Sequence, residues 1–134
     1  MIVLQELLGI LLTDSTFSVV VLDSFDISTI ESIRQENTER AGQILSKNNP
    51  NDLKSSWSLG LEGTDRRYVP MNGALSSDQL AWLEETLSRT AEQGETAIVL
   101  CHVPLHPQAA NNLCLLWNYQ VSLPPLSLSP AVSV

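Results

Sequence analysis

The chain has 134 residues, of which 43% are hydrophobic, and this length and composition suit one folded domain. Seven basic residues against fifteen acidic ones give a net charge of -8, which argues against a nucleic-acid-binding surface, because such surfaces need clustered Lys and Arg. Two cysteines, Cys101 and Cys114, are too few for a disulfide framework. We therefore expect a reduced chain with a cytoplasmic location and no nucleic-acid partner.

Residues 1–16 begin with the apolar run MIVLQELLGILL, which resembles a signal sequence only superficially. The run has no basic region before it, contains Glu6 and offers no clear small-residue cleavage site. It is also shorter than the roughly 20 apolar residues that span a bilayer. We expect an atypical N-terminal segment over residues 1–16, either a helix or an irregular end, and no membrane association.

The first predicted strand is 17-FSVVVLD-23, a continuous run rich in β-branched residues that ends at an acidic residue. A short run that is apolar on both faces is typical of a central strand covered by helices on each side. Residues 27–47 then have apolar positions at roughly helical spacing, and the turn-forming segment 48-NNPND-52 ends them. Residues 48–72 read as a long loop, and such loops in compact domains are usually functional or mobile.

The clearest predicted helix starts near residue 76, in 76-SSDQLAWLEETLSRTAEQG-94. Ser76 or Ser77 can cap it, and Gln79 stands three residues after Ser76, as in a capping box. Gly94 is a natural stop. The apolar stripe of this predicted helix consists of Leu80, Leu83 and Leu87, with Trp82 beside it. A second buried strand, 96-TAIVLCH-102, follows at once, and a helix followed by a strand is half of a βαβ unit, so we expect an α/β sheet.

The C-terminal tail, residues 120–134, differs in composition from the rest of the chain. After Gln120 it contains Ser, Pro, Leu, Val and Ala and no charged residue. Its prolines exclude a helix or a central strand. We expect a low-complexity, disordered tail after a domain that covers residues 17–119.

The two histidines, His102 and His106, suggest a metal site. A helical zinc site is excluded because Pro104 lies between them, and proline interrupts the helix. A zinc site that adds Cys101 and Cys114 is disfavoured, because the neighbours Cys101 and His102 point to opposite faces of a strand. The same geometry disfavours Cys101 and His102 as a nucleophile–base pair.

His102 alone remains a good candidate ligand, because it stands at the carboxyl end of a buried strand. Ligand sites of α/β sheets form at that edge, and neutral imidazole binds catalytic metals. Pro104 and Pro107 would hold the next loop in an extended shape. The alternative is a histidine that emerges at a strand end and bonds a carbonyl, and the residues alone favour this alternative.

Four segments in order resemble one family across residues 17–119. They are 19-VVVLDSFDIS-28, 72-NGALSSDQLAWLEETL-87, 98-IVLCHVPLHP-107 and 113-LCLLWNY-119. Their succession resembles the manganese-dependent ADP-ribose/CDP-alcohol diphosphatases, which are calcineurin-like metallophosphatases. The resemblance implies an α/β fold that is an incomplete fragment of a layered metallophosphatase-like β-sandwich flanked by helices.

The resemblance also implies a chemistry and a site. The family hydrolyses the pyrophosphate bond of ADP-ribose, CDP-choline and similar nucleotides at a dinuclear Mn²⁺ centre. The histidine of its H-x-P motif is a metal ligand, and His102 occupies that position, whereas His106 would have only a supporting role. Asn72, Gly73, Trp117 and Asn118 fall within family-like segments, with no substrate-binding role assigned to them. No catalytic residue is assigned.

Several expected metal motifs are absent from the chain. The sequence contains no D-x-H, G-D-x-x-D, G-N-H or G-H-x-H motif, and Asp23 aligns with a strand that carries no ligand. A two-metal centre needs several carboxylates and histidines. We therefore expect a partial chain with little or no activity of its own. The alternative is a non-catalytic α/β module that pairs with another chain through an incomplete sheet.

Overall fold

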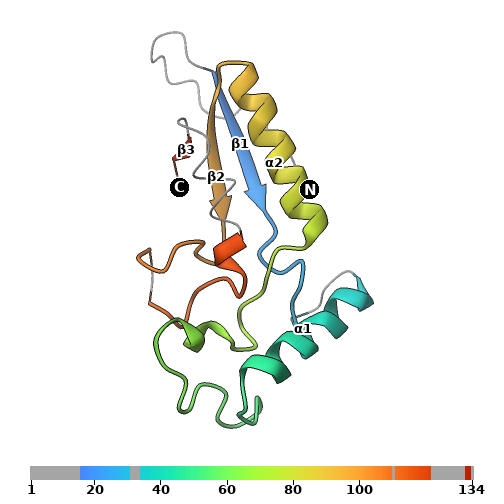
Figure 1. Ribbon diagram of the computed structural model, residues 1–134, viewed down its shortest axis with the longest axis vertical. Coiled ribbons are helices and arrows are strands. Elements are labelled where there is room, and N and C mark those ends of the chain that lie inside the picture. The colour runs from blue at the N-terminus through green and yellow to red at the C-terminus, as the bar shows by residue number, and fades with distance from the viewer. Residues whose placement is uncertain (1–15, 31–33, 110, 122–131, 134) are drawn as a thin grey trace.

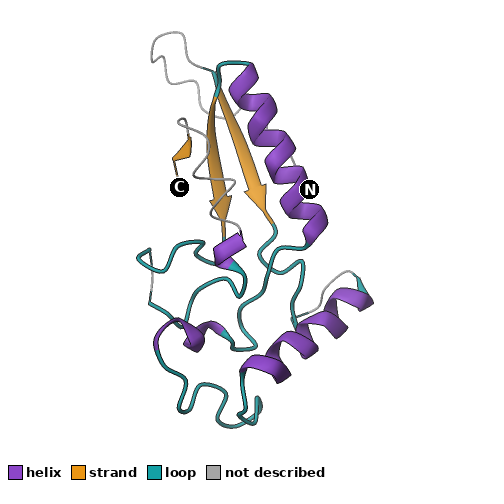
Figure 2. Ribbon diagram, in the orientation of Figure 1, coloured by secondary structure: helices purple, strands orange, loops and turns teal. Residues whose placement is uncertain are grey.

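The computed structural model describes residues 16–30, 34–109, 111–121 and 132–133. In chain order, the elements are β1 (Phe17–Leu22), α1 (Gln35–Asn48), the 3₁₀ helix η1 (Gly63–Arg67), α2 (Ser77–Glu92), β2 (Thr96–Cys101) and β3 (Val132–Ser133). Figure 1 shows α2 running alongside β1 and β2, while α1 and the irregular segments gather beyond the ends of these two strands. Figure 2 shows how much of that second region is loop.

The sheet is parallel throughout, with the strand order β1-β2-β3. Phe17 pairs with Thr96 at one end of the β1–β2 ladder, and Leu22 pairs with Cys101 at the other. Because the chain passes through α2 between these strands, β1, α2 and β2 form the βαβ unit that the sequence predicts. The α/β class is confirmed.

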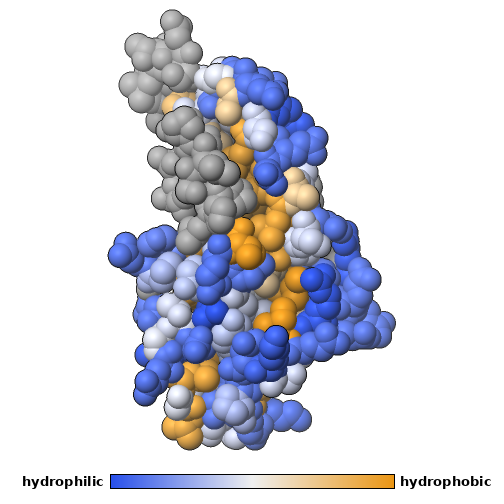
Figure 3. Space-filling model, in the orientation of Figure 1, coloured by the Kyte–Doolittle hydropathy of each residue, from blue (hydrophilic) through white to orange (hydrophobic). Residues whose placement is uncertain are grey.

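The two faces of the sheet differ in burial. Val20, Leu22 and Val99 are buried in the core. On the opposite face, Val21 is 37% exposed and Leu100 is 50% exposed. The expectation that strand 17–23 is covered on both faces is therefore wrong, because the described helices pack on one face only. Figure 3 shows apolar surface along the sheet beside α2.

Helix α1 begins later than the sequence predicts and ends where expected. It spans Gln35–Asn48, and Ala41 and Leu45 on its inner face are fully buried. Asn49 follows the helix, and its side-chain Nδ2 donates to the carbonyls of Trp57 (2.7 Å) and Tyr68 (2.6 Å). The predicted long loop over residues 48–72 is irregular apart from η1, and Asn49 fixes its path.

Helix α2 confirms the predicted N-cap and corrects the predicted capping box. Ser76 is the N-cap, and its Oγ accepts a hydrogen bond from the backbone N–H of Gln79. The backbone N–H of Ser76 donates to Oδ2 of Asp26 instead of to the Gln79 side chain. Because Asp26 accepts the hydrogen bond that a capping box would assign to the Gln79 side chain, that side chain is available to bind the end of β1. Gly94 adopts a φ of +69° just beyond the helix, a conformation that favours glycine.

The two ends of the chain fall mostly outside the described residues. The expectations for residues 1–16 and 120–134 concern mainly residues 1–15, 122–131 and 134, which the structure does not describe. Val132 pairs with Ala97 in the short edge strand β3, which differs from the expected disordered tail at two residues. Within the described residues, no helix is long and apolar enough to cross a membrane.

Candidate functional site

His102 lies directly after β2, at the carboxyl end of the sheet. Its side chain is exposed, and the nearest aromatic ring is that of Phe25, with ring centroids 5.7 Å apart and planes tilted by 44°. None of the hydrogen bonds found within the described part of the chain involves the His102 imidazole. In the described part of the chain the imidazole therefore bonds no backbone carbonyl, and its nitrogens are open to a ligand.

His106 has a different role, in the loop that follows. Its Nδ1 accepts a hydrogen bond from the backbone N–H of Gln108 at 3.2 Å, and its carbonyl accepts one from Ala109 at 2.9 Å. These two bonds close a tight turn from His106 to Ala109, which contains Pro107. One ring nitrogen of His106 is thus already engaged with its own loop, and its supporting role stays a prediction.

Cys101 precedes His102 and faces the interior. Burial raises the pKa of its thiol to about 11, and the negative charge of Asp23 acts in the same direction. A thiol with this pKa stays protonated near neutral pH, whereas nucleophilic attack needs the thiolate. The chemistry of Cys101 therefore agrees with the geometric argument against a Cys–His nucleophile pair.

The donor set around His102 is too small for two metal ions. The described residues contain no group of three or more His, Cys, Asp or Glu side chains that could hold a metal. Asp23 lies at the same edge, because it follows the β1 residue paired with Cys101, but its Oδ1 accepts a hydrogen bond from Phe25 N–H at 2.9 Å. These residues do not fit a dinuclear Mn²⁺ centre by themselves. His102 is a single candidate ligand.

Asn72 and Gly73 connect the loops beyond the sheet. Nδ2 of Asn72 donates to the carbonyls of Arg67 (2.8 Å) and Leu113 (2.7 Å). The carbonyl of Gly73 accepts a hydrogen bond from Trp117 N–H at 2.9 Å. A Cβ atom at position 73 would lie 2.2 Å from the carbonyl oxygen of Ser24, so only glycine fits there. Both residues hold backbone segments together.

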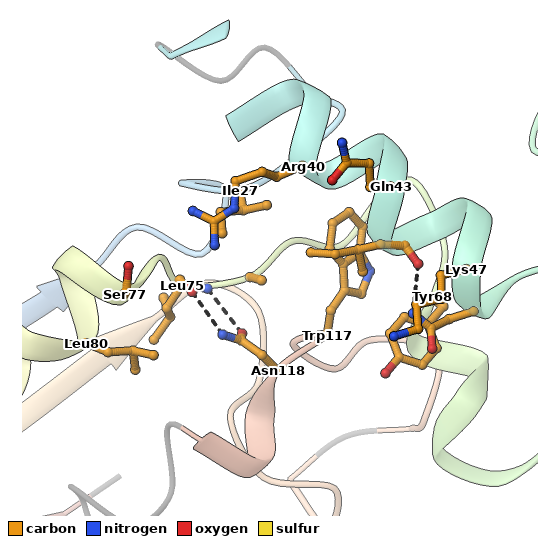
Figure 4. Close-up of a pocket in the computed structure, with 13 residues that line it drawn as sticks. Ile27, Arg40, Gln43, Lys47, Tyr68, Leu75, Ser77, Leu80, Trp117 and Asn118 are labelled. Carbon is orange, nitrogen blue, oxygen red and sulfur yellow. Dashed lines mark hydrogen bonds between the residues drawn. The ribbon is translucent and has the colours of Figure 1, made fainter. Parts of the chain in front are cut away.

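Trp117 and Asn118 complete these connections. Trp117 is 2% exposed, and its carbonyl accepts a hydrogen bond from Nε of Arg67 at 2.9 Å. Asn118 pairs with the backbone of Leu75 through two hydrogen bonds, which are drawn as dashed lines in Figure 4. The segments from residues 72 and 113 thus form one hydrogen-bonded unit beside the edge that carries His102. This positioning role had no signature in the sequence.

Arg67 and Gln79 are two positioning residues that sequence reasoning missed. The guanidinium of Arg67 is buried, 4.0 Å above the ring of Tyr68 and 5.3 Å from that of Tyr119. Gln79 binds the end of β1, since its Oε1 accepts from Asp23 N–H (2.7 Å) and its Nε2 donates to Asp23 O (3.0 Å). A polar residue on the buried side of a predicted helix was a usable signal for Gln79, but nothing local distinguishes Arg67 from Arg66.

Comparison with solved structures defines the class of fold. The chain matches the crystal structure of a dimetal phosphatase from Danio rerio with a TM-score of 0.80 and 32% sequence identity. The match covers 90% of this chain and 38% of that structure. The described architecture is therefore that of part of a dimetal phosphatase.

Comparison with curated proteins then identifies the family. Manganese-dependent ADP-ribose/CDP-alcohol diphosphatase from Arabidopsis thaliana is 40% identical over 104 residues, which are 77% of this chain and 33% of the relative. The Xenopus tropicalis protein of that name is 37% identical over 120 residues (87% and 33%), and the human one is 34% identical over 110 residues (80% and 31%). No family model matches.

The chain belongs to the family of manganese-dependent ADP-ribose/CDP-alcohol diphosphatases. It spans about a third of the length of the curated relatives that it matches. The resemblance deduced from the four sequence segments is confirmed.

Proposed function

We propose that the chain takes part in Mn²⁺-dependent hydrolysis of the pyrophosphate bond of ADP-ribose and CDP-alcohols, with His102 as one metal ligand. The observation that carries this proposal is the relationship to manganese-dependent diphosphatases at 40% identity, together with the TM-score of 0.80 to a dimetal phosphatase. The proposed substrate is a small nucleotide, and the proposal includes neither a nucleic-acid nor a membrane partner. The free thiols of Cys101 and Cys114 support a cytoplasmic location.

The chain's own residues hold the His102 imidazole in a fixed position at the carboxyl edge of the sheet. Two divalent ions, when bound in such hydrolases, neutralise phosphate oxygens and activate a water molecule. His102 can supply a neutral nitrogen ligand, and its backbone is fixed because Cys101 pairs with Leu22. The following loop is fixed as well, because the carbonyl of Pro104 accepts a hydrogen bond from Leu116 N–H at 3.0 Å.

The net charge of the chain is a second argument for metal dependence. A net charge of -8 repels a nucleotide diphosphate, and bound cations would reverse that repulsion locally. A single imidazole binds a divalent ion weakly, so we expect the 134-residue chain alone to turn over ADP-ribose far more slowly than a complete diphosphatase.

A chimera tests the proposal most directly. Residues 17–119 of this chain would replace the matching segment of the Arabidopsis diphosphatase, and release of AMP from ADP-ribose would be followed with and without Mn²⁺. We expect Mn²⁺-dependent turnover. The His102→Ala chimera should lose more than about a hundredfold, since even the outer partners of metal ligands are worth about 10–100-fold.

The matched control is His106→Ala in the same chimera, which should lose less than about tenfold because His106 interacts with its own loop. Full activity of the His102→Ala chimera would contradict the assigned role of His102. A folded chimera that is inactive with every residue intact would contradict the catalytic proposal itself. The isolated chain is assayed in parallel with ADP-ribose and CDP-choline.

One observation favours the second candidate, a non-catalytic α/β module that pairs with another chain. Phe17, Val21 and Leu100 are 48%, 37% and 50% exposed on the face of the sheet that α2 does not cover. Apolar sheet surface of this kind is a common site of association. Size-exclusion chromatography with light scattering would reveal such pairing, and Val21→Lys with Leu100→Lys should abolish it without affecting the core.

A further inference from the structure

A groove lies between α1, the start of α2 and the segment around Trp117. Its volume is about 660 Å³, within the range of small-molecule sites. Figure 4 shows α1 above the groove, and Leu75 and Asn118, which come from two separate segments of the chain, below it. His102 does not line this groove. The groove is therefore separate from the proposed metal ligand His102, and the proposed hydrolysis gives it no role.

The charged residues of the groove are all basic. Among the described residues that line it, the charged ones are Arg40 and Lys47. They stand seven positions apart on α1, so they lie on one side of the helix, about 10 Å apart along its axis. Gln43 and Ile44 line the groove between them. A positive site in a chain of net charge -8 favours an anionic ligand.

The indole of Trp117 provides an independent indication of a ligand. It extends from its loop toward α1, between Arg40 and Lys47 in the view of Figure 4. Trp117 is 2% exposed, and its Nε1 is buried without a hydrogen-bond partner in the described part of the chain. An unpaired buried N–H group is unfavourable by about 1–3 kcal/mol, and an acceptor atom on a ligand would remove that penalty.

The remaining walls suit a flat apolar body. Ile27, Leu75 and Leu80 line the groove with aliphatic surface, and Tyr68 contributes a second ring. Ser77, the first residue of α2, also lines the groove and adds a small polar side chain to this wall. The lining thus combines apolar and aromatic surface with cations.

We propose that this groove binds an organic phosphate with a planar apolar body, of the size of a nucleoside monophosphate. The phosphate lies between Arg40 and Lys47, and the planar body packs on Ile27 and Leu75 with an acceptor atom toward Nε1 of Trp117. This site needs no metal ion, so it is tested separately from the metal-dependent hydrolysis.

The probe is AMP, titrated into the full 134-residue chain in the presence of EDTA. Binding is measured by calorimetry and by the indole N–H resonances in a ¹H–¹⁵N spectrum. The three indole signals are assigned with Trp57→Phe and Trp82→Phe variants, which leave Trp117 intact. We expect AMP to shift the Trp117 signal, and the Arg40→Gln/Lys47→Gln variant to bind at least tenfold more weakly.

The matched control is Lys54→Gln/Arg89→Gln, which removes the same charges from exposed positions outside the groove. It should bind AMP as the unmodified chain does. Equal loss in both double variants would mean that net charge alone attracts the nucleotide, and the proposal would be wrong. An unmoved Trp117 signal would also overturn it.

Two partial ligands separate the contributions of the phosphate and the planar body. Inorganic phosphate and adenosine should each bind at least tenfold more weakly than AMP. If phosphate alone binds as tightly as AMP, the groove is a simple anion site and the planar-body assignment is wrong. If adenosine alone does so, the role of Arg40 and Lys47 is wrong.

Discussion

Asn118 pairs with the backbone of Leu75 as a neighbouring strand would. Its Nδ2 donates to the Leu75 carbonyl at 2.9 Å, and its Oδ1 accepts from the Leu75 N–H at 3.1 Å. Leu75 is 1% exposed, so water could not readily replace these two hydrogen bonds if the Asn118 side chain were removed. One side chain thus satisfies both polar groups of a buried residue 43 positions away in the sequence.

Replacing Asn118 by Ala should destabilise the fold by about 2 kcal/mol, because a buried donor and acceptor lose their partners. Urea unfolding followed by circular dichroism measures this difference. The control is Asn112→Ala, at a partly exposed position in the same segment, which should change the free energy of unfolding by less than about 0.5 kcal/mol. Equal effects of the two changes would contradict the structural role of Asn118.

Two Gly→Ala changes should act in opposite directions. At Gly73 the new Cβ would lie 2.2 Å from the Ser24 carbonyl oxygen and 2.9 Å from that of Ile27, so the backbone must move. We expect a loss of about 3 kcal/mol or more. At Gly42, in the middle of α1, nothing lies within 4 Å of the new Cβ. That change should stabilise the helix by about 0.5–1 kcal/mol.

Thermal unfolding of both variants checks this pair, with the unmodified chain as reference. A destabilised Gly42→Ala variant would contradict the exposed helical position of Gly42. A Gly73→Ala variant of normal stability would contradict the close approach of the segments at Ser24 and Gly73.

Arg67→Met should cost about 3 kcal/mol, because the guanidinium is 4% exposed and donates to the carbonyls of Trp117 and Thr64 (2.9 and 2.7 Å) and to the Tyr68 hydroxyl. Methionine keeps much of the volume but none of the donors. Arg66→Met removes the same charge from the exposed neighbouring position and should be nearly neutral. Denaturant midpoints of the two variants provide the comparison. A similar midpoint shift in both would show that charge, not these contacts, matters.

Cys101 predicts a specific loss of stability in alkali. Its pKa is raised by burial from 9.0 to about 11, so between these values the unfolded chain releases a proton that the folded chain retains. The free energy of unfolding therefore falls as pH rises from about 9 to about 11 and is unaffected by this group below pH 9. Urea midpoints at pH 8 and pH 10.5 measure the effect.

The control for this alkaline effect is Cys101→Ala, which should lose less stability over the same pH interval. An identical loss in the variant would assign the pH dependence to other groups. Alkylation by iodoacetamide at pH 8 gives a second measure, since exposed Cys114 should react well before Cys101. Peptide mass spectrometry distinguishes the two sites.

The elements that local pattern determines were predictable from sequence. The apolar runs gave both long strands, and Ser76 with Gly94 bounded α2, since capping depends on residues within one turn. The burial of β1 was not predictable, because its outer face depends on what packs there and not on its own residues. The capping-box prediction failed at Gln79 because Asp23 and Asp26, 56 and 53 positions away, compete for its side chain.

The candidate site was predictable only as far as a single residue. Strand position and the succession of segments indicated His102, and the structure adds a free imidazole at the carboxyl edge. The hydrogen bonds of Asn72 and Asn118 join segments about 40 residues apart, so no local spacing could reveal them. The groove beside Trp117 had no sequence signal either, because its walls come from three separate parts of the chain.

The bonds from Gln79 to Asp23 also have a consequence for how fast the chain folds. They join residues 56 positions apart. The parallel pairing of β1 with β2 also requires the long chain segment between these strands to close into a loop. The entropy lost in closing a loop must be met before such contacts stabilise anything, so topologies of this kind fold slowly. Helices α1 and α2 should therefore gain structure first in a stopped-flow experiment, with the β1–β2 ladder forming in the slower, rate-limiting phase.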